Sequence, residues 1–415
     1  MSLSQVKKIL LISSGQPSLN PRLVKEADAL ADAGYDVTVL YAYWNEWGTG
    51  FDKELLPSKK WKAICTGGDP LQKNGIFFLS RLIHKIAKTV NQKTGAKYLI
   101  ELAIARASYF LLREAKKYRA DLYIGHNLGA LPATVKAAKA NKKPCGFDAE
   151  DFHRFEVSDN INDTDVILKT KLEDRYLPHV DYLTVSSPLI AEKYKHLYPD
   201  KKPVVILNVF PRDLNIQSPE LNSEAPIRLF WFSQTIGPGR GIEDVIAALL
   251  LLKEYPFEIH LLGHLSVEMQ NAFINKIAGI ESVNLYLHPP IPPDDITAFA
   301  SQFDIGLASE NSVPLNRDIC LPNKIFTYIQ AGLAVMASDT SAQSKLLNEY
   351  PGIGKVYKKR DVEALSAALL YYHQNWEKLF ETRKASLELA RAKLNWETES
   401  QSFLATVEKT LTSFE

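Results

Sequence analysis

A glycine-rich stretch in the second half of the chain has the composition of a phosphate-binding loop. It reads Phe232-Ser233-Gln234-Thr235-Ile236-Gly237-Pro238-Gly239-Arg240-Gly241 and follows an apolar run that starts at Ile227. Its three glycines free the backbone to wrap an anion, and Arg240 offers a fork of N–H groups that fits two phosphate oxygens. A helix predicted from Ile242 would add the positive end of its dipole. The stretch therefore predicts a phosphate site, with a flexible loop that binds nothing as the alternative.

Two further segments favour ligand binding at the starts of helices. In Leu321-Pro322-Asn323-Lys324, Asn323 fits a helix cap. Lys324 stands in the first turn, where the helix dipole repels it unless an anion binds there; a solvent-facing lysine is the alternative. The loop Ser13-Ser14-Gly15-Gln16-Pro17 has small residues that would let backbone N–H groups approach a ligand. It lacks the G-x-G-x-x-G pattern, so a nicotinamide site is not supported, and a plain turn is the alternative.

The three segments must be positioned by secondary-structure elements, and the sequence predicts alternating strands and helices around them. Short apolar runs alternate with helical patterns, which is typical of parallel sheets built from β-α-β units. Predicted strands in the first half are Lys8–Ser13, Asp36–Ala42, Asp121–Gly125, Cys145–Asp148, Tyr182–Val185 and Val204–Leu207. Those in the second half are Ile227–Phe232, Glu258–Leu262, Ser282–Leu287, Asp304–Ala308 and Ala334–Ala337, and predicted helices include Arg22–Ala33, Ile242–Lys253 and Asn323–Ala331.

The length of 415 residues and a polar stretch near the middle indicate two domains. We predict an N-terminal Rossmann-like domain over residues 1–210, a linker over 211–226 and a second Rossmann-like domain over 227–390. A last helical segment covers 391–415. The predicted fold class is α/β, with two doubly wound domains in tandem, and ligands of such sheets bind at the carboxyl ends of the strands.

The amino-acid composition and net charge indicate which classes of binding partner to expect. A formal net charge of +1, with 46% hydrophobic and 23% charged residues, is that of an ordinary globular protein and gives no field that favours nucleic acid. The three cysteines lack the spacing of a zinc site or a disulfide framework, and so few suit a reducing compartment. No apolar run approaches the roughly 18 residues that a membrane span needs. We expect a cytoplasmic protein, with any membrane contact peripheral and at the inner membrane face.

The ligand-binding segments, in their order along the chain, resemble the retaining GT-B glycosyltransferases, in particular glycosyltransferase family four. The resemblance covers nearly the whole chain: Pro21-Arg22, Glu26-Ala27, Leu30, Gly34 and Val37-Thr38-Val39 are similar to that family's first β-α-β unit, and Asn395-Trp396-Glu397 to its closing helix, which returns to the first domain. It implies transfer of a sugar, with retention of configuration, from a nucleoside diphosphate sugar to a glycan, lipid-linked or small-molecule acceptor. It also implies a hexosyltransferase of polysaccharide biosynthesis that needs no metal ion and no cofactor besides this co-substrate.

The resemblance also assigns the site residues. His126, in Tyr123-Ile124-Gly125-His126-Asn127, matches the histidine that lies beside the transferred sugar, and Ile124 replaces an earlier histidine of that motif. We expect His126 to be the catalytic residue. The residues expected to bind the donor are Gly15, Gln234, Thr235, Gly239, Arg240, Gly241, Gly263, Asn323, Lys324 and Thr327.

Two motifs depart from the family's usual residues. Arg240-Gly241 matches a Lys-Gly pair, but Thr235 stands where a second diphosphate-binding charge is usual, so we expect Lys324 to replace part of it. Ile319 and Thr327 stand where the family has two glutamates, and the Thr327 hydroxyl would hold a ribose more weakly than a carboxylate. Two alternatives therefore stay open: a degenerate GT-B binding protein without catalysis, and a nucleotide-sugar epimerase.

A run of carboxylates, Asp148-Ala149-Glu150-Asp151, follows a predicted strand. It fits a solvated loop, a metal site, which the resemblance does not require, or a set of groups that orients the acceptor. We expect Asp148, Glu150 and Asp151 on the acceptor side. Four histidines, His153, His260, His264 and His288, are scattered, and of these His264 follows Gly263 at a predicted strand end.

A basic stretch between Arg81 and Arg119 predicts a second kind of contact. It holds ten basic residues against two glutamates, a local net charge of +8. Apolar residues interleave at helical spacing, as in helices that lie in an anionic membrane surface. The alternative is that these residues pack on the first-domain sheet and the lysines are solvated. Peripheral membrane contact through residues 81–119 predicts salt-sensitive binding to anionic vesicles, lost when Lys85, Lys88 and Lys93 become glutamate.

Overall fold

The computed structural model describes residues 6–95, 97–220, 225–237 and 239–414. The chain divides into two compact units. The first comprises Met1–Ile206, Pro314–Asn316 and Ser400–Glu415, and the second Leu207–Val313 and Arg317–Glu399. The linker predicted over 211–226 falls in the second unit, and its residues 221–224 lie outside the described residues. Pro238 of the glycine-rich stretch and Glu415, at the end of the predicted last segment, also lie outside them.

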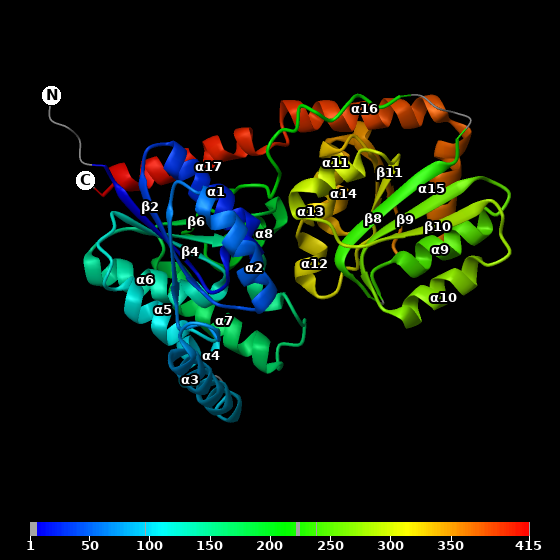
Figure 1. The fold of residues 1–415 in the computed structure, drawn as a ribbon. Helices are drawn as coiled ribbons and strands as arrows, with labels where there is room; N and C mark the ends of the chain where they lie inside the picture. Colours follow the sequence, from blue (N-terminus) through cyan, green and yellow to red (C-terminus); the bar gives the residue numbers. More distant parts are fainter. Residues whose placement is uncertain (1–5, 96, 221–224, 238, 415) are drawn as a thin grey trace, which may run out of the picture. The chain divides into compact units, whose positions relative to one another are not determined.

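A seven-stranded parallel sheet forms the centre of the first unit, in the order β3-β2-β1-β4-β5-β6-β7. Helices lie on both faces of this sheet (Figure 1), so the inner strands are buried along their length and appear in the sequence as continuous apolar runs. The strands are β1 (Lys8–Ser13), β2 (Asp36–Ala42), β3 (Lys62–Thr66), β4 (Leu122–His126), β5 (Cys145–Ala149), β6 (Tyr182–Val185) and β7 (Val204–Val205).

The first helix of this unit begins and ends at residues suited to caps. α1 starts after Asn20, whose side chain accepts the backbone N–H of Leu23, and Pro21 fits the first turn. Gly34, with a φ of 91°, follows Ala33, the C-cap residue of this helix. The helices are α1 (Pro21–Asp32), α2 (Glu46–Leu55), α3 (Asn74–Lys93), α4 (Ile100–Ala103), α5 (Ser108–Ala115), α6 (Leu131–Asn141), α7 (Thr164–Tyr176), α8 (Pro188–Leu197) and the part of α17 (Trp396–Thr412) from Ser400 onward.

A six-stranded parallel sheet forms the centre of the second unit, in the order β10-β9-β8-β11-β12-β13. Its strands are β8 (Ile227–Ile236), β9 (Phe257–Leu265), β10 (Val283–His288), β11 (Ile305–Ala308), β12 (Ala334–Ser338) and β13 (Gly354–Tyr357). The helices are α9 (Ile242–Leu251), α10 (Val267–Ile277), α11 (Ile296–Ala300), α12 (Leu315–Ile319, whose first two residues belong to the first unit), α13 (Asn323–Gln330), α14 (Ser341–Glu349), α15 (Val362–Gln374) and α16 (Trp376–Ala392). Trp231, fully buried on β8, lies in the core of this unit.

Most predicted strands match the structure to within one residue at each end, but β8 and β9 are longer than predicted. After a register shift, Thr235 and Ile236 of β8 pair with His264 and Leu265 of β9. Gln234 and Thr235 therefore lie in a strand and not in a loop, and Gly263 lies inside β9 and not at its end. The prediction stopped both strands too early because polar residues interrupt their apolar runs.

Three of the four strands at the sheet edges were predicted poorly, and β10 is the exception. β3 and β13 were missed, and β7 is half as long as its predicted range. An edge strand is covered less than an inner one, so it needs fewer buried apolar residues and gives a weaker sequence pattern; along β3 only Thr66 is buried.

Both sheets reverse their strand order beside their first strand. In the first unit, β1 lies between β2 and β4, and in the second, β8 lies between β9 and β11. At such a reversal the connections leave toward opposite faces, which opens a crevice at the carboxyl ends of the two strands. The crevices at β1/β4 and β8/β11 are therefore the places where each unit is expected to bind a ligand.

Candidate active site

The glycine-rich loop lies at the carboxyl ends of β8 and β11. Ser309, which directly follows β11, donates its hydroxyl to the backbone carbonyl of Arg240 at 3.1 Å, and the Asn311 side-chain amide donates to that of Gly239 at 2.5 Å. Gly239 and Gly241 have φ angles of 71° and 82°. A Cβ atom at position 241 would lie 2.7 Å from that of Ser309. The loop is thus held in a conformation that favours glycine.

Arg240 has a free charge on this loop. Its side chain is partly exposed, and among the residues that the structure describes no carboxylate forms an ion pair with it. Helix α9 begins two residues later, and the Glu243 side chain in its first turn accepts the Gly239 N–H at 3.1 Å. An anion at the loop would meet the Arg240 guanidinium and the remaining amides of this helix start.

Lys324 has an internal counter-ion that sequence reasoning missed. Its Nζ lies 2.6 Å from Oε1 of Glu310 and 4.8 Å from the centroid of the Trp231 ring, and the residue is 9% exposed. Glu310 directly follows Ser309, so one segment after β11 contacts both the glycine-rich loop and Lys324. The sequence predicted an anion beside Lys324 in the first turn of this helix, and in this structure the Glu310 carboxylate is that anion. Compensation by Lys324 for the charge missing at Thr235 stays a prediction.

The other residues predicted on α13 make contacts within the second unit. Asn323 is exposed, and its side-chain oxygen accepts a hydrogen bond from Nδ2 of Asn208 at 2.9 Å. Thr327 is 2% exposed and donates its hydroxyl to the Asn323 backbone carbonyl, one turn earlier, at 3.2 Å. A ribose contact by Thr327 would need this internal bond to open.

The residues predicted on β8 and β9 differ in exposure. Gln234 and Thr235 are exposed near the end of β8. Gly263 is buried, and a Cβ atom there would lie 2.1 Å from the backbone oxygen of Ser233. The close approach of β8 and β9 therefore already explains a glycine at position 263.

His126 ends β4 in the interior of the first unit. It is 1% exposed and lies between two carboxylates: its Nε2 is 3.2 Å from Oε2 of Glu26, and its Nδ1 is 3.7 Å from Oδ2 of Asp148. Burial lowers the pKa of His126, but Glu26 and Asp148 outweigh this and raise the pKa above its ordinary value. Contact of His126 with a sugar stays a prediction, since the imidazole is enclosed in this structure.

Asp148 is engaged by an arginine. Nε and Nη2 of Arg22 each donate to one oxygen of Asp148 at 2.7 Å, and the Thr184 hydroxyl donates to it at the same distance. Burial raises the pKa of Asp148, but Arg22 outweighs burial and holds the pKa below its ordinary value. Asp148 is 1% exposed, so the geometry supports a positioning role, and its place on the acceptor side stays a prediction.

Sequence reasoning recognised Arg22 and Glu26 only as family-like residues. Their spacing of four residues on a helix was the available signal, because it places both on one face of α1. Both are fully buried, with Arg22 Nε 3.7 Å from Oε1 of Glu26. Together with His126 and Asp148 they form a set of four charged or titratable groups, which we name the buried quartet.

Glu150 and Asp151 follow β5 and keep partial exposure at the carboxyl edge of the first sheet. Burial and the neighbouring Asp151 charge raise the pKa of Glu150 to about 7. Burial, with repulsion from Glu156, also raises the pKa of Asp151. A carboxyl group with a pKa near 7 can accept or donate a proton at neutral pH, which suits a group beside an acceptor hydroxyl.

Gly15 lies at the other predicted ligand-binding edge, where β1 and β4 end. Its N–H donates to Oγ of Ser13 at 3.1 Å, and the Ser13 hydroxyl lies 3.0 Å from Oδ1 of Asn127. Gly15 is partly exposed, and an added Cβ atom would meet no other atom within 4 Å. The loop is thus open at the crevice of the first unit.

Of the scattered histidines, His153, His260 and His288 have structural contacts, whereas His264 is exposed on β9 opposite Thr235. The Nδ1 atom of His260 lies 3.0 Å from Nε2 of His288 with the rings stacked, and Nδ1 of His153 lies 3.4 Å from Oε2 of Glu156. Within the described residues, no group of three or more His, Cys, Asp or Glu side chains is placed to hold a metal ion.

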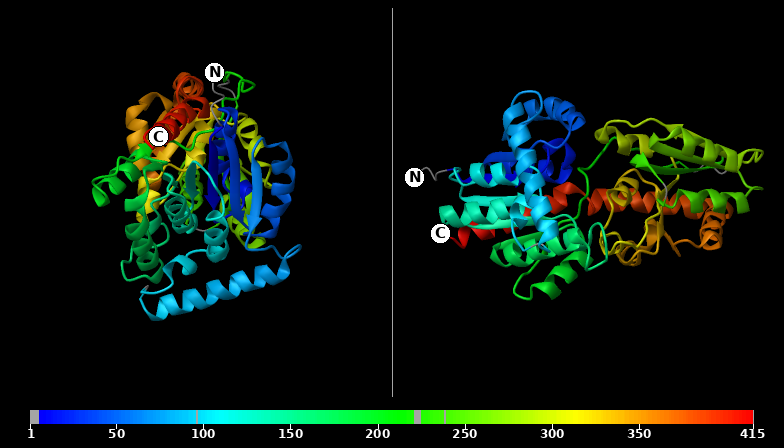
Figure 2. Two further views of the ribbon diagram at one scale, coloured as in Figure 1. Left: turned by 90° about the vertical axis from the view of Figure 1, so that its left-hand side faces the viewer. Right: turned by 90° about the horizontal axis from the view of Figure 1, so that it is seen from below.

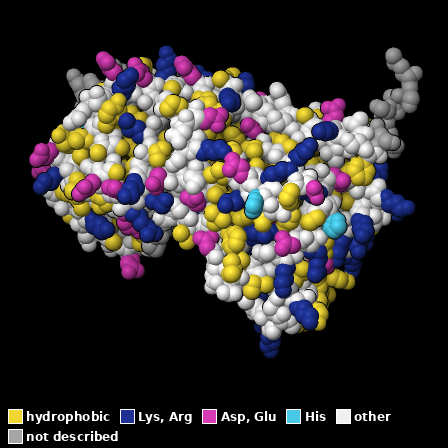
Figure 3. Space-filling model, turned by 180° about the vertical axis from the view of Figure 1, so that it is seen from behind, with side chains coloured by type: hydrophobic (Ala, Val, Ile, Leu, Met, Phe, Trp, Pro, Cys, Tyr) yellow, Lys and Arg dark blue, Asp and Glu magenta, His cyan; other side chains and the backbone are white. Residues whose placement is uncertain are grey.

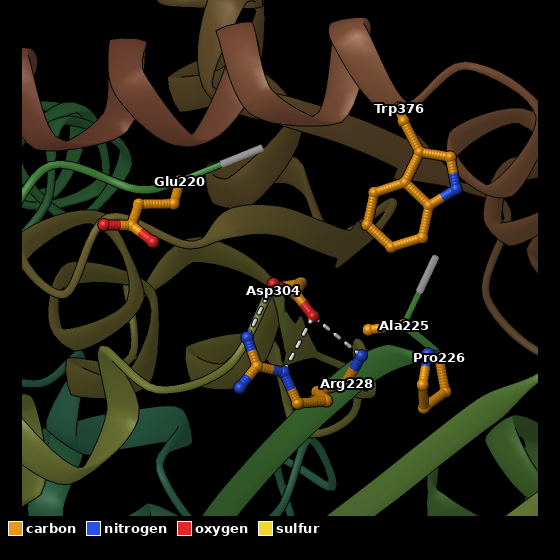
Figure 4. Close-up of a pocket in the computed structure, with 6 residues that line it drawn as sticks. All are labelled: Glu220, Ala225, Pro226, Arg228, Asp304 and Trp376. Carbon is orange, nitrogen blue, oxygen red and sulfur yellow. Dashed lines mark hydrogen bonds and ion pairs between the residues drawn. The ribbon is translucent and has the colours of Figure 1, made fainter. Parts of the chain in front are cut away.

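The cavity in Figure 4 lies at the opposite edge of the second sheet from the glycine-rich loop. Arg228 is the second residue of β8, and Asp304 directly precedes β11. The Nε atom of Arg228 lies 3.1 Å from Oδ2 of Asp304. Arg383 adds a second ion pair to Asp304 at 2.7 Å. The cavity is lined by Glu220, Ala225, Pro226, Arg228, Asp304 and Trp376. Its charges neutralise one another at the amino ends of the strands, so it is not part of the candidate site.

Comparison with known proteins finds solved structures with a similar architecture. No family model matches the chain, and no curated protein matches it. A sucrose-phosphate synthase from Thermosynechococcus elongatus is similar in structure, with a TM-score of 0.68 and 15% identity over 98% of this chain and 100% of that one. A glycosyltransferase from Rickettsia africae has a TM-score of 0.66 and 13% identity over 98% and 99% of the two chains. HepE from Anabaena, in complex with UDP-glucose, has a TM-score of 0.63 and 14% identity over 97% and 100%.

These similarities extend over both units and nearly the full length of each compared chain. They agree with two parallel sheets whose strand order reverses beside the first strand. The protein has the GT-B fold of glycosyltransferases, built from two Rossmann-like units.

Proposed function

We propose that this protein transfers a hexose, with retention of configuration, from a nucleoside diphosphate sugar to an acceptor hydroxyl. The observation that carries the proposal is Arg240, which forms no ion pair with any described carboxylate and lies on a glycine-constrained loop at the strand-order reversal of the second unit. That is where a GT-B fold would bind a diphosphate. The HepE structure holds UDP-glucose, so UDP is the first nucleotide to test.

In the proposed reaction the acceptor oxygen attacks the anomeric carbon on the face from which the diphosphate leaves. The bond from that carbon to the phosphate oxygen breaks, and the acceptor proton passes to the leaving phosphate. Arg240 and the start of α9 would stabilise the negative charge that develops on the diphosphate, with Lys324 adding charge once a phosphate competes for it with Glu310. No metal ion or further cofactor takes part in this proposal, and the acceptor is a glycan, a lipid-linked molecule or a small molecule.

Nucleotide binding tests the proposal directly. A nucleoside diphosphate at about 100 times its dissociation constant should stabilise the folded protein by about 2.7 kcal/mol, which a thermal-shift measurement detects as a higher melting temperature. The matched control is the corresponding nucleoside, which lacks the phosphates and should give a much smaller shift. Absence of a shift with every common nucleoside diphosphate would contradict the proposal.

His126 should serve turnover more than donor binding. His126→Ala is expected to lower the turnover rate roughly ten- to a hundredfold, the scale of a hydrogen bond to a charged group, while nucleotide affinity stays nearly unchanged. Glu26→Gln is the control, because it breaks the same buried pair but keeps the imidazole. If both variants lose the same turnover, or if His126→Ala mainly weakens nucleotide binding, His126 does not have this role.

A second candidate function is nucleotide or glycan binding without catalysis. Two observations favour it: Glu310 already neutralises Lys324, and the Thr327 hydroxyl is bonded within its own helix. This candidate predicts a nucleotide-dependent thermal shift without sugar transfer to any acceptor in a broad screen. Incubation with nucleotide sugar alone separates the epimerase alternative, since only an epimerase would make a new nucleotide sugar.

A further inference from the structure

One face of α3 leaves large apolar side chains in solvent. Phe78, Leu79, Leu82 and Ile86 are 66%, 48%, 54% and 53% exposed. Their spacing places them on one side of the helix, whereas the buried residues Ser80, Ala87 and Asn91 lie on the opposite side. In both views of Figure 2, α3 lies along the outside of the first unit. A contiguous apolar face of this kind marks an interaction surface.

The charges around this face have a single sign. Residues 74–93 include four basic residues and no aspartate or glutamate. Lys85 and Lys88 are exposed beside the apolar stripe, and the Arg81 guanidinium lies 4.1 Å from the centroid of the Phe77 ring. In Figure 3, Lys and Arg side chains gather with hydrophobic ones over the lower end of the first unit, where Figure 1 places α3. The surface therefore suits a partner that is apolar inside and anionic outside.

The rest of the basic stretch between Arg81 and Arg119 does not offer such a surface. Ile100 and Ala103 of α4 are 1% and 3% exposed, and Phe110 and Leu111 of α5 are 6% and 0% exposed. These helices pack their apolar residues inside the first unit, as the alternative interpretation of this stretch expected. Tyr98, Leu99 and Tyr109 are also exposed in this stretch, but among its described helices α3 has the largest exposed apolar face beside basic residues.

We propose that α3 docks the protein on an anionic lipid bilayer. Phe78, Leu82 and Ile86 would enter the boundary between headgroups and acyl chains, and Lys85 and Lys88 would contact the anionic headgroups. A second copy of this chain fits the same surface poorly, because two such faces would bring cations against cations with no carboxylate on either helix. Charge complementarity thus selects the bilayer over a dimer.

Docking through α3 would also place a lipid-linked acceptor near the reaction edge, a step that rests on the proposed function. The Phe77 ring lies 5.6 Å from that of Tyr43, which follows the carboxyl end of β2 by one residue. The first turn of α3 is therefore next to the carboxyl edge of the first sheet, the edge that bears Gly15 and Glu150. A headgroup leaving the bilayer beside this turn has a short path to that edge.

The test is flotation of the full-length protein with vesicles of phosphatidylcholine alone or mixed with phosphatidylglycerol, without nucleotide. We expect binding to the anionic vesicles only, falling as salt rises. Leu82→Ser/Ile86→Ser and Lys85→Glu/Lys88→Glu should each weaken partitioning by roughly tenfold or more. The matched controls in the same unit are Val157→Ser/Ile161→Ser, which removes exposed apolar side chains elsewhere, and Lys139→Glu/Lys193→Glu, which changes net charge equally. Both controls should bind like the parent protein.

Absence of flotation at low salt, or flotation that the α3 variants leave unchanged, would overturn the docking proposal. A lipid-free dimer that Leu82→Ser/Ile86→Ser converts to monomer would overturn it too, since it would assign the face to a second copy. Thermal shifts with nucleotide on the same preparations keep the two proposals apart. A parent protein that does not float but keeps its thermal shift refutes docking alone, and a parent protein that floats but shows no shift refutes donor binding alone.

Discussion

Arg22→Met is expected to destabilise the first unit by roughly 3–5 kcal/mol, a large part of the stability of an ordinary domain. Removing the guanidinium leaves Asp148 buried without its counter-ion, beside a second buried carboxylate on Glu26. Urea denaturation followed by circular dichroism measures the loss. Lys60→Met is the control, because its ion pair with Asp32 is short but exposed, and its loss should leave the denaturation midpoint nearly unchanged.

The same variant has a pH signature. Arg22 holds the pKa of Asp148 below its ordinary value, so the stabilisation is present above the pKa of an unfolded aspartate, about 3.9, and is lost as the pH falls through the folded value. The acid limb of the stability curve should therefore flatten in Arg22→Met. Adding Asp148→Asn should restore part of the lost stability, because it removes the uncompensated charge. A midpoint close to that of the parent protein would show that the pair is dispensable.

Arg240→Ala is expected to raise the dissociation constant for a nucleoside diphosphate by about 10- to 150-fold, equivalent to a loss of about 1.5–3 kcal/mol for a hydrogen bond to a charged group. The reason is the Arg240 guanidinium on the glycine-rich loop, which no carboxylate in the described part of the chain neutralises. Isothermal titration calorimetry measures the change. Lys253→Ala, which removes one charge beyond the other end of α9, should bind like the parent protein. Equal affinities of Arg240→Ala and the parent would remove this role.

Lys324 should be coupled to Arg240 when both act on one diphosphate. Lys324→Ala also uncovers Glu310, whose charge would itself repel a phosphate. Measuring Lys324→Ala in a Glu310→Gln background separates the two effects. A loss of affinity that persists there and is non-additive with Arg240→Ala supports direct binding. A loss that disappears there shows that Lys324 acts by covering a carboxylate.

The sequence identified the elements that are buried on both faces. Strands such as β4 and β5 have a continuous apolar pattern because helices lie on both sides of them, and the loop from Gly237 to Gly241 stands out because its backbone needs glycine. Edge strands lacked that pattern. The ends of β8 and β9 depend on a register shift between two strands, and no local pattern in either strand encodes it.

Side-chain partners were the hardest feature to predict. Glu310 meets Lys324 because β11 and α13 converge at one edge of a sheet, and Arg22 meets Asp148 across 126 residues of chain. Such pairs follow from the strand order, which a single sequence does not specify. For the same reason the exposed face of α3 could not be distinguished from the buried faces of α4 and α5, which lie in the same basic stretch of the sequence.

The buried quartet has a consequence for proton movement. The charges of Arg22 and Asp148 cancel one another. Burial raises the pKa of Glu26, and Glu26 and Asp148 outweigh burial to raise that of His126, which favours one proton shared by Glu26 and His126. With one shared proton the quartet is electrically neutral whichever of the two carries it. Release of that proton to solvent would leave a net negative charge in a medium of low dielectric constant, which is unfavourable. Proton release from the quartet to solvent is therefore disfavoured. If His126 contacts a sugar as predicted, we expect it to act as a fixed, preoriented dipole or cation.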